Sequence, residues 1–190
     1  MRTLIYTAFV SADGVVEGPG GEDGYRNSGW TFTDIEFLPE AYELKGREQA
    51  EAGAMLLGRV SYQSFAPVWP SMAEFSRYRE LPKYVLSTTL TEADLVDNWG
   101  PTTILRSLDD VAALKQTDGG PILVHGSASL ARDLADAGLL DRYNLLIFPV
   151  VLGAGKRMWS DADKAKQRLR VVESECYPNG IQKMVYDVVG

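Results

Sequence analysis

Residues 121–130 read Pro-Ile-Leu-Val-His-Gly-Ser-Ala-Ser-Leu, an apolar run that passes through a glycine-containing turn into a helix-like stretch. The unbroken apolar run at 121–124 predicts a strand buried on both faces, as in a parallel sheet. Glycine lets the backbone approach a ligand closely, and free N–H groups at a helix start attract anions. The stretch therefore predicts a strand, turn and helix that can hold a phosphate, although a Gly-Ser helix start is more often an ordinary cap.

The same design recurs earlier in the chain. Strand 54–57 runs into Gly58-Arg59-Val60-Ser61 and then into a predicted helix. Two such turns at one edge of a sheet suit the pyrophosphate of a dinucleotide. A third candidate is strand 84–87, which ends in Ser87-Thr88-Thr89. These hydroxyls suit a phosphate, but they also fit an ordinary strand-end turn.

The remaining apolar segments predict further strands at 3–10, 102–105 and 143–152. Helical stretches are expected between the strands, at 34–51, 59–66, 71–80, 107–116 and 127–138. Pro39 either interrupts the first helix or marks its true start. Segments 168–177 and 181–189 alternate instead, and Pro178-Asn179-Gly180 between them predicts a hairpin. We therefore predict one domain over residues 1–190, a three-layer α/β fold with a mixed, mostly parallel sheet, flanking helices and a C-terminal antiparallel hairpin.

The composition limits the classes of function. A net charge of −7 and a pI near 4.8 argue against binding to a nucleic-acid backbone, which needs concentrated Lys and Arg. No run approaches the ~18 apolar residues of a membrane span, and the first residues are typical of a strand rather than a signal peptide. The single cysteine, Cys176, suits a reducing compartment, and its alternation with Glu173 and Glu175 predicts a core position. We therefore expect a cytoplasmic protein without nucleic-acid or membrane partners.

The single histidine, His125, removes two classes of enzyme. A Ser-His-Asp hydrolase needs an imidazole that reaches a serine from another element, and no G-x-S-x-G motif is present. Catalytic zinc sites usually draw on several His and Cys ligands, so no metal is expected. The run 153–156, Gly-Ala-Gly-Lys, is no phosphate loop, because Val150 and Arg157 stand where glycine and Ser or Thr are needed. We interpret it as a tight turn at the exit of a strand, with a substrate loop as the alternative.

Five segments together resemble the dihydrofolate-reductase-like superfamily, and most closely its branch related to the reductase domain of bacterial riboflavin biosynthesis. The resemblance covers nearly the whole chain. It depends on Val10 to Val16, Leu56 to Tyr62, Val85 to Thr89, Val124 to Ser127 and Phe148 to Gly155. It implies a reductase that uses NADPH to reduce a small heterocyclic substrate of pteridine, pyrimidine or riboflavin-precursor type, and it implies a homodimer, to which the apolar strand 145–151 is expected to contribute.

The resemblance also implies roles for individual residues. Arg59 is expected near the adenosine 2′-phosphate, and the backbone around Val16 near the nicotinamide carboxamide. The full set implied for cofactor binding is Val16, Gly58, Arg59, Val60, Ser61, Ser87, Thr88, Thr89, His125, Gly126, Ser127 and Ala128.

Three residues are candidates for catalysis, and each has a structural alternative. Asp34 aligns with the carboxylate that supports substrate protonation in the folate enzymes, but it also fits a helix cap. Asp13 can instead shape its loop. Trp30, on the glycine-rich loop 17–30, can stack on a substrate or anchor the core.

Two departures from the folate enzymes bear on function. His125 stands where those enzymes have glycine. Leu81 stands where they have the arginine that holds the folate glutamate, so we expect dihydrofolate to bind poorly; Arg77, Arg79 and Lys83 are close enough to substitute. An alternative from another class also stays open, namely a non-catalytic NADPH-binding module that acts as a sensor or binding partner.

Overall fold

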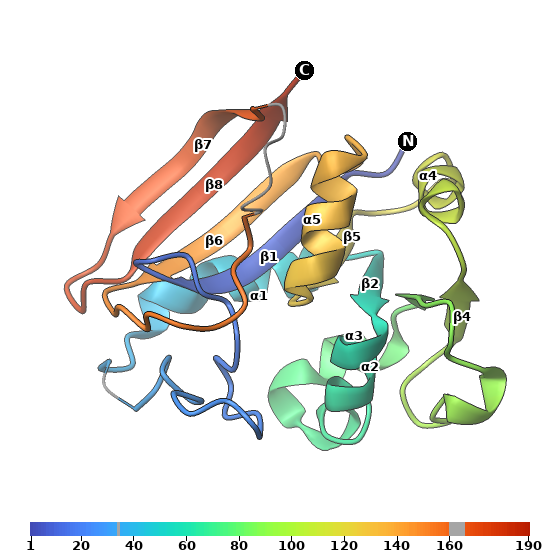
Figure 1. Cartoon of the computed structure of the whole chain (residues 1–190), viewed down its shortest axis with the longest axis horizontal. Helices are drawn as coiled ribbons and strands as arrows, with labels where there is room; N and C mark the ends of the chain where they lie inside the picture. Colours follow the sequence, from blue (N-terminus) through green and yellow to red (C-terminus); the bar gives the residue numbers. More distant parts are fainter. Residues whose placement is uncertain (34, 160–165) are drawn as a thin grey trace.

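The computed structural model describes residues 1–33, 35–159 and 166–190 (Figure 1). Eight strands form one sheet in the order β4-β3-β2-β5-β1-β6-β8-β7. Strands β1 to β6 pair in parallel, whereas β8 is antiparallel to both β6 and β7. The bounds are β1 Leu4–Ser11, β2 Ala54–Gly58, β3 Lys83–Leu86, β4 Thr102–Leu105, β5 Ile122–His125, β6 Arg142–Phe148, β7 Arg168–Cys176 and β8 Gln182–Val189. The predicted mixed sheet with a C-terminal antiparallel hairpin is confirmed.

Helices cover both faces of the sheet and make three layers. They are α1 Glu43–Glu51, α2 Arg59–Phe65, α3 Ser76–Glu80, α4 Leu108–Lys115 and α5 Ala128–Asp136. Leu134 of α5 and Val111 of α4 pack in the core on one face, whereas Leu44 of α1 and Tyr78 of α3 pack on the other. In Figure 1 α5 accordingly lies in front of the sheet and α1 behind it. None of the helices in the described ranges has the length and apolar character needed to span a bilayer.

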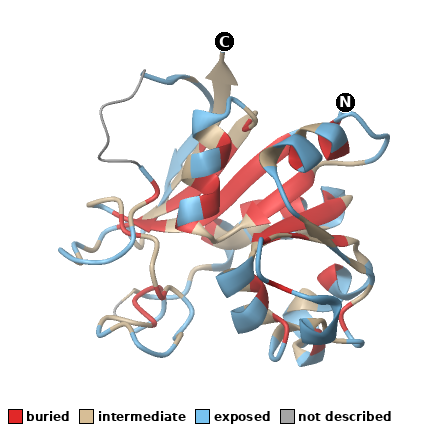
Figure 2. Cartoon of the chain, turned by 45° about the vertical axis from the view of Figure 1, so that its right-hand side comes forward, coloured by how far each residue is buried: buried red, intermediate tan, exposed pale blue. Residues whose placement is uncertain are grey.

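The central strands are buried on both faces, as their unbroken apolar sequences predict. Leu56 of β2 packs in the core beside α5, whereas its neighbours Met55 and Leu57 pack on the opposite face. Figure 2 shows this burial running through the middle of the sheet, with the exposed surface on the outer sides of the helices. A parallel sheet needs such double-sided burial because its crossover helices cover both faces.

Some predicted bounds are wrong. Pro39 begins a 3-10 turn, Pro39–Tyr42, which leads directly into α1. Of the two predicted alternatives, Pro39 therefore marks the true start of the helix and does not interrupt it. Proline suits this place because it is pre-organised for a first helical turn. Strand 143–152 ends at Phe148, because Pro149 has no N–H to donate and the N–H of Val150 turns back to the Phe148 carbonyl at 2.8 Å. Residues 145, 146 and 148 are buried within the monomer, so the exposed apolar surface of the expected segment 145–151 lies after β6, at Val151.

The core position predicted for Cys176 is wrong, because the side chain is exposed. Strand β7 is the edge of the sheet, and its pairing with β8 is irregular between Val171 and Glu173. Beyond this irregularity Ser174, Glu175 and Cys176 are all exposed, so neither face of the strand is covered there. The alternation along residues 171–177 therefore does not indicate a buried face.

Candidate active site

The two glycine-serine turns meet at the carboxyl ends of the neighbouring strands β2 and β5. The Ser127 hydroxyl oxygen accepts a hydrogen bond from the N–H of Gly58 at 3.1 Å and lies 2.5 Å from the hydroxyl oxygen of Ser61. A Cβ added at Gly58 would lie 2.9 Å from the Ser127 hydroxyl oxygen, so this approach requires glycine. The structure thus joins into one surface the two turns that the sequence singles out separately.

The backbone at the start of α5 is strained in a way that suits anion binding. Ser127 has φ +60°, the single positive φ of a non-glycine residue within the described ranges. Such strain is found mainly where function requires it. Because the Ser127 side chain is turned toward Gly58 and Ser61, it does not cap α5. The first N–H groups of this nine-residue helix thus lack a side-chain acceptor and fit a phosphate oxygen.

Arg59 lies on the same surface and is exposed, at the first position of α2. Its guanidinium donates to the side-chain oxygen of Gln63 at 2.8 Å, one helical turn further on. The neighbouring Val60 is exposed as well. Arg59 therefore makes a neutral, exposed contact, which an incoming anion can replace.

The turn after β3 is shaped by Ser87, which is buried. Its hydroxyl oxygen accepts from the N–H groups of Thr89 at 3.2 Å and Leu90 at 2.9 Å, while the side chains of Thr88 and Thr89 are exposed. Arg106, which we did not predict, donates to the carbonyls of Ser87 and Leu90, both at 2.8 Å. The sequence could have indicated Arg106, because it directly follows β4, the neighbour of β3. A second arginine thus stands beside the hydroxyls predicted to meet a phosphate.

His125 ends β5 but its ring is turned into an aromatic cluster. It stands edge-on to Trp69 at 5.0 Å and to Tyr78 at 6.0 Å between ring centroids, and Phe65 adds a third such contact. Burial, with a smaller contribution from the charge of Lys45, lowers the pKa of His125 to about 3. The imidazole is therefore neutral at physiological pH and is not a cation for a phosphate.

Asp13 fastens the loop after β1 to the segment after β6. Its carboxylate accepts hydrogen bonds from the Ser11 hydroxyl at 2.6 Å and from the N–H groups of Leu152 and Gly153 at 3.1 and 2.9 Å. The bond from Ser11 is the main cause that lowers the pKa of Asp13 to about 2. This arrangement corresponds to the loop-shaping alternative for Asp13.

The neighbouring backbone is tied down in the same way. The N–H of Val16 donates to the Lys156 carbonyl at 2.9 Å, so only the Val16 carbonyl is left to meet a carboxamide. Gly155 packs against Val15 so closely that an added Cβ would lie 2.6 Å from it. The glycines at 153 and 155 both have positive φ, as expected for a tight turn at the exit of β6.

Trp30 anchors the glycine-rich loop. Its indole is buried, donates to the Glu17 carbonyl at 2.8 Å and packs edge-on against Phe148 at 5.4 Å. This arrangement corresponds to the core-anchor alternative. Trp30 also lines, with residues 26–28, 33 and 150–152, an open pocket of about 550 Å³. Asp34, the third candidate for catalysis, lies outside the described residues.

Three cations, Arg77, Arg79 and Lys83, were considered as substitutes for the missing folate arginine. Of these three residues, Arg79 alone is free to take that role. Leu81 packs against the core beside α3. Lys83 is fully buried, and its ammonium donates to the carbonyls of Tyr78 and Arg79 at 2.5 and 2.8 Å. Arg77 donates to the last carbonyls of α1, those of Gln49 and Ala50, at 3.1 and 3.0 Å.

A buried polar cluster beneath α1 was missed by the sequence analysis. Glu48 is only 4% exposed, and its carboxylate accepts hydrogen bonds from the hydroxyl of Thr7 at 2.8 Å and the side-chain amide of Asn144 at 2.8 Å. The Lys45 ammonium lies 3.4 Å from Glu48 and also donates to Thr7. A buried charge is tolerated only when paired and hydrogen-bonded, which this cluster satisfies. The one feature of the sequence that could have indicated this buried cluster is the polar residue Thr7 within the apolar run 3–10.

Fold and site together define an α/β protein of the dihydrofolate-reductase-like fold, with two joined glycine-serine turns at the carboxyl ends of its parallel strands. The family model for the RibD C-terminal domain matches residues 2–183, so the chain belongs to this family. The uncharacterized protein YyaP of Bacillus subtilis strain 168 is 30% identical over 194 residues, which cover 97% of this chain and 94% of YyaP.

Two solved structures share the fold. A putative riboflavin biosynthesis protein from Shewanella sp. PV-4 superposes with a TM-score of 0.75 at 17% identity and covers 100% of both chains. The dihydrofolate reductase of Enterococcus faecalis, solved with NADP(H), gives a TM-score of 0.60 at 13% identity and covers 99% of this chain and 97% of its own. Family and fold support a reductase-type oxidoreductase that acts on a pyrimidine- or pteridine-like molecule. Among the described residues no cluster of His, Cys, Asp or Glu is arranged to hold a metal.

Proposed function

We propose that the protein is a cytoplasmic, single-domain NADPH-dependent reductase of a small heterocyclic substrate of pyrimidine, pteridine or riboflavin-precursor type. The observation that carries the proposal is the surface on which the turns at Gly58 and Ser127 meet. Ser127 holds a strained backbone at φ +60° while its hydroxyl reaches Gly58 and Ser61, which leaves the first N–H groups of α5 without a cap. Such a surface suits the pyrophosphate of a dinucleotide.

Residues of this chain can be assigned to the parts of the cofactor. The N–H groups at Ser127 and Ala128 bind the pyrophosphate, with Ser61 and the close approach at Gly58 on the opposite side. Arg59, which follows β2, binds the adenosine 2′-phosphate, and the hydroxyls of Thr88 and Thr89 stand beside it in the turn after β3, the neighbour of β2. The Val16 carbonyl meets the nicotinamide carboxamide. Bound NADPH supplies the hydride, while the protein contributes position and electrostatics.

The substrate class is supported by the relatives. One structural neighbour is described as a riboflavin biosynthesis protein and another as a dihydrofolate reductase, and the substrates of both activities are nitrogen heterocycles. Leu81 in place of the arginine argues against a substrate with a glutamate tail, because of Arg77, Arg79 and Lys83 the exposed Arg79 alone is left to pair with that carboxylate. The expected substrate is therefore a heterocycle without such a tail.

Titration calorimetry with NADPH and NADH tests the cofactor, followed by NADPH oxidation at 340 nm across a panel of pyrimidines, pterins and flavin precursors. Stoichiometric, NADPH-selective binding with turnover of one panel member is the expected result. Absence of NADPH binding would contradict the proposal. Tight binding without turnover of any panel member would instead favour the binding-module alternative.

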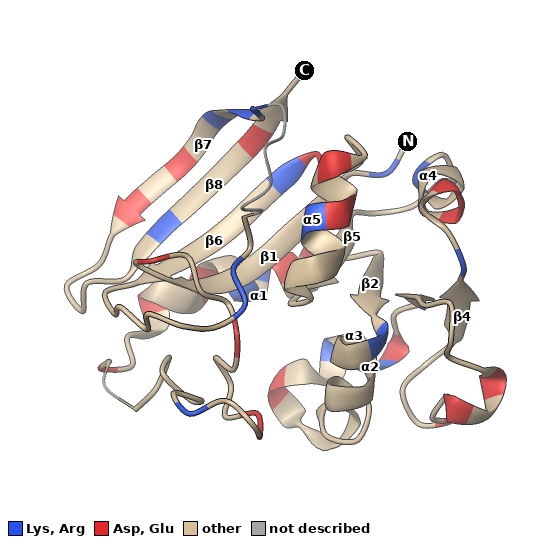
Figure 3. Cartoon of the chain, viewed as in Figure 1, with Lys and Arg blue, Asp and Glu red and all other residues tan. Residues whose placement is uncertain are grey.

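We also propose that the protein is a homodimer that pairs through the edge strand β7. Val171 and Val172 are exposed at the middle of this edge. Two arginines, Arg168 and Arg170, precede them and two glutamates, Glu173 and Glu175, follow, a pattern visible along β7 in Figure 3. An antiparallel copy of the same strand would set arginines opposite glutamates, which favours self-pairing.

A further inference from the structure

An open cavity of about 550 Å³ lies between the glycine-rich loop and the segment after β6. It follows the carboxyl end of β6, so it lies at the same edge of the sheet as the starts of α2 and α5. The wall formed by residues 150–152 accepts a hydrogen bond from the N–H of Ala12 at 2.8 Å. Trp30, in another wall, donates to the carbonyl of Glu17 at 2.8 Å. Because Glu17 directly follows Val16, the cavity adjoins the loop proposed to meet the nicotinamide.

Arg26 is the one charged residue among the described residues that line this cavity. Its side chain is exposed, and within the described ranges it makes no hydrogen bond or ion pair. The nearest acidic residues before it in the sequence, Glu22 and Asp23, do not line the cavity. Asn27 and Ser28 add an amide and a hydroxyl to the same wall. The cavity therefore offers one uncompensated positive charge on a chain whose net charge is −7.

The remaining lining of the cavity is suited to a flat, largely apolar ring. Trp30, Val150 and Leu152 contribute apolar surface, and Val151, which is 77% exposed, extends it to the rim. Binding sites for small molecules commonly have volumes of roughly 300–1,000 Å³, mostly apolar walls and a few well-placed polar groups. The cavity has these features, and its one cation belongs to the polar wall of residues 26–28.

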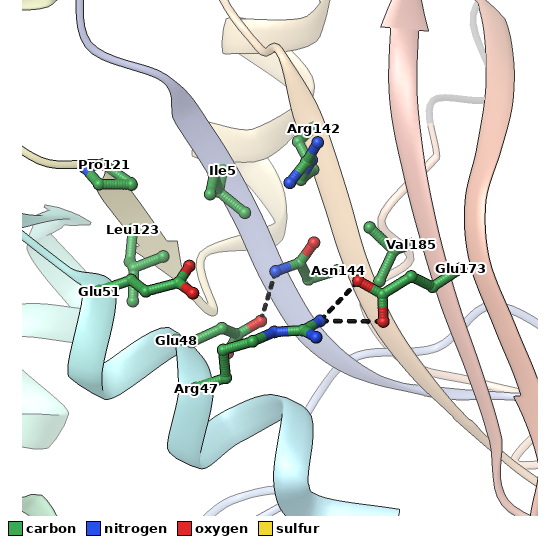
Figure 4. A pocket seen from close by; sticks show the side chains of 10 residues that line it. All are labelled: Ile5, Arg47, Glu48, Glu51, Pro121, Leu123, Arg142, Asn144, Glu173 and Val185. Carbon is green, nitrogen blue, oxygen red and sulfur yellow. Dashed lines mark hydrogen bonds and ion pairs between the residues drawn. The ribbon is translucent and has the colours of Figure 1, made fainter.

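A second cavity, of about 200 Å³ behind α1, has no such free cation among its described lining residues (Figure 4). Its two arginines are each paired with a carboxylate, Arg47 with Glu173 at 2.8 Å and Arg142 with Asp187 at 2.8 Å. Three glutamates also line it, so an anion would meet net negative charge there. Of these two cavities, the one beside the glycine-rich loop is therefore suited to an anionic ligand.

We infer that the substrate is a heterocycle with a carboxylate attached close to its ring, and that Arg26 binds this carboxylate. The inference rests on the proposed function and names its substrate class. A planar guanidinium matches the two oxygens of a carboxylate, and one cation neutralises one negative charge. A phosphate, with nearly two negative charges at neutral pH, would be neutralised only in part. The carboxylate takes no part in the reaction; it orients the ring beside the loop that carries Val16.

Titration calorimetry with matched pairs of ligands tests the inference on the full chain. The pairs are uracil-6-carboxylate with uracil and pterin-6-carboxylate with pterin, each measured with and without NADPH. In at least one pair the acid should bind at least about tenfold more tightly, the lower end for a charge-assisted contact. Arg26→Gln, which removes the charge at an exposed position, should abolish this preference, whereas Arg26→Lys should keep part of it. Arg79→Gln, exposed and near Leu81 before the start of β3, is the matched control and should keep all of it.

Equal binding of acid and uncharged ligand in both pairs would overturn the inference, and so would a preference that survives in Arg26→Gln. A preference lost in Arg79→Gln would also overturn it, because the carboxylate would then bind where the folate enzymes hold their glutamate. Tighter binding of uridine 5′-monophosphate than of uracil-6-carboxylate would overturn it in favour of a phosphate. An Arg26-dependent preference in a protein that binds no NADPH would count against the proposed function alone. NADPH-dependent reduction of uncharged heterocycles only would leave the proposed function standing and overturn this inference.

Discussion

Cofactor choice is decided at the level of single side chains. NADPH and NADH differ by one phosphate, so discrimination requires a cation and donors beside the adenosine ribose. Arg59 is exposed, and its guanidinium donates to the neutral side chain of Gln63. A cation at the start of a helix opposes the helix dipole unless an anion lies nearby, which favours a ligand-binding role for Arg59.

Arg59→Ala should weaken NADPH binding about 10- to 150-fold, the equivalent of a charge-assisted contact of ~1.5–3 kcal/mol, and leave NADH nearly untouched. Titration calorimetry with both cofactors measures this. Arg79→Ala, exposed and remote from the joined turns, is the control. Equal losses for the two cofactors would place Arg59 at the shared pyrophosphate, and no loss would remove it from the site.

Arg106 gives a second test at the residue scale. Its guanidinium holds the carbonyls of Ser87 and Leu90, so Arg106→Ala should loosen the Ser87–Thr89 turn as well as remove a charge. We expect it to weaken binding of both cofactors, and NADPH more strongly. An unchanged NADPH affinity would show that this turn does not take part in binding.

Substrate choice has a similar test at Leu81. The wild type should turn over dihydrofolate poorly, whereas Leu81→Arg should lower the KM for dihydrofolate by supplying a partner for the glutamate carboxylate. Leu81→Met, which keeps the apolar packing, is the control. Wild-type turnover comparable with that of dedicated folate reductases would contradict the interpretation.

At the scale of elements, the carboxylate of Asp13 holds the loop after β1 in its conformation. The folded-state pKa of Asp13 is about 2, below the ordinary value of 3.8, so its ionised form stabilises the fold. That contribution is complete above pH 3.8 and is lost as the pH falls toward 2. Asp13→Asn should therefore lower the free energy of unfolding at pH 6, and the difference from wild type should narrow by pH 3.

Urea unfolding at the two pH values measures this, with Asp97→Asn, an exposed carboxylate without such bonds, as the control. A difference that stays constant from pH 6 to pH 3 would mean that the Asp13 charge does not hold the loop. If Asp13→Asn lowers the affinity for NADPH as well as the stability, the loop after β1 also contributes to cofactor binding through Val16.

The elements themselves were largely predictable, because local patterns determine them. Unbroken apolar runs predicted doubly buried strands, and each strand followed by glycine and serine predicted a turn at a helix start. The bulge in β7 was not predictable, since it arises from pairing with β8 and not from the sequence of β7. The exposure of Cys176 was missed for another reason, namely that β7 is the edge of the sheet and is exposed on both faces at residues 174–176.

The site was predictable in part, for a similar reason. The turns at Gly58 and Ser127 are marked by their own sequences, but the bond between them joins residues 69 apart. The burial of Glu48 depends on Thr7 and Asn144, which are 41 and 96 residues away. On α1 alone, Lys45 and Glu48 are typical of an exposed ion pair.

At the scale of the whole molecule, the edge strand β7 predicts assembly. Light scattering at micromolar concentration should give a mass of about twice the 20.9 kDa chain. Val172→Glu should shift the protein toward a monomer by placing like charges at the centre of the edge. Val68→Glu, an equally apolar exposed valine elsewhere, is the control. A wild-type mass near 20.9 kDa would contradict the homodimer.

The central place of β1 has a consequence for how the protein is made. Of the described strands β1 leaves the ribosome first, yet both of its neighbours come late, and Leu4 pairs with Ile122, 118 positions further along (122 − 4 = 118). Such distant pairing slows folding. Until β5 and β6 emerge, the apolar run at residues 4–10 has no strand to join and stays open to chaperones or to other nascent chains. Pausing of translation once β6 has left the ribosome, rather than earlier, would give β1 time to pair with both of its neighbours.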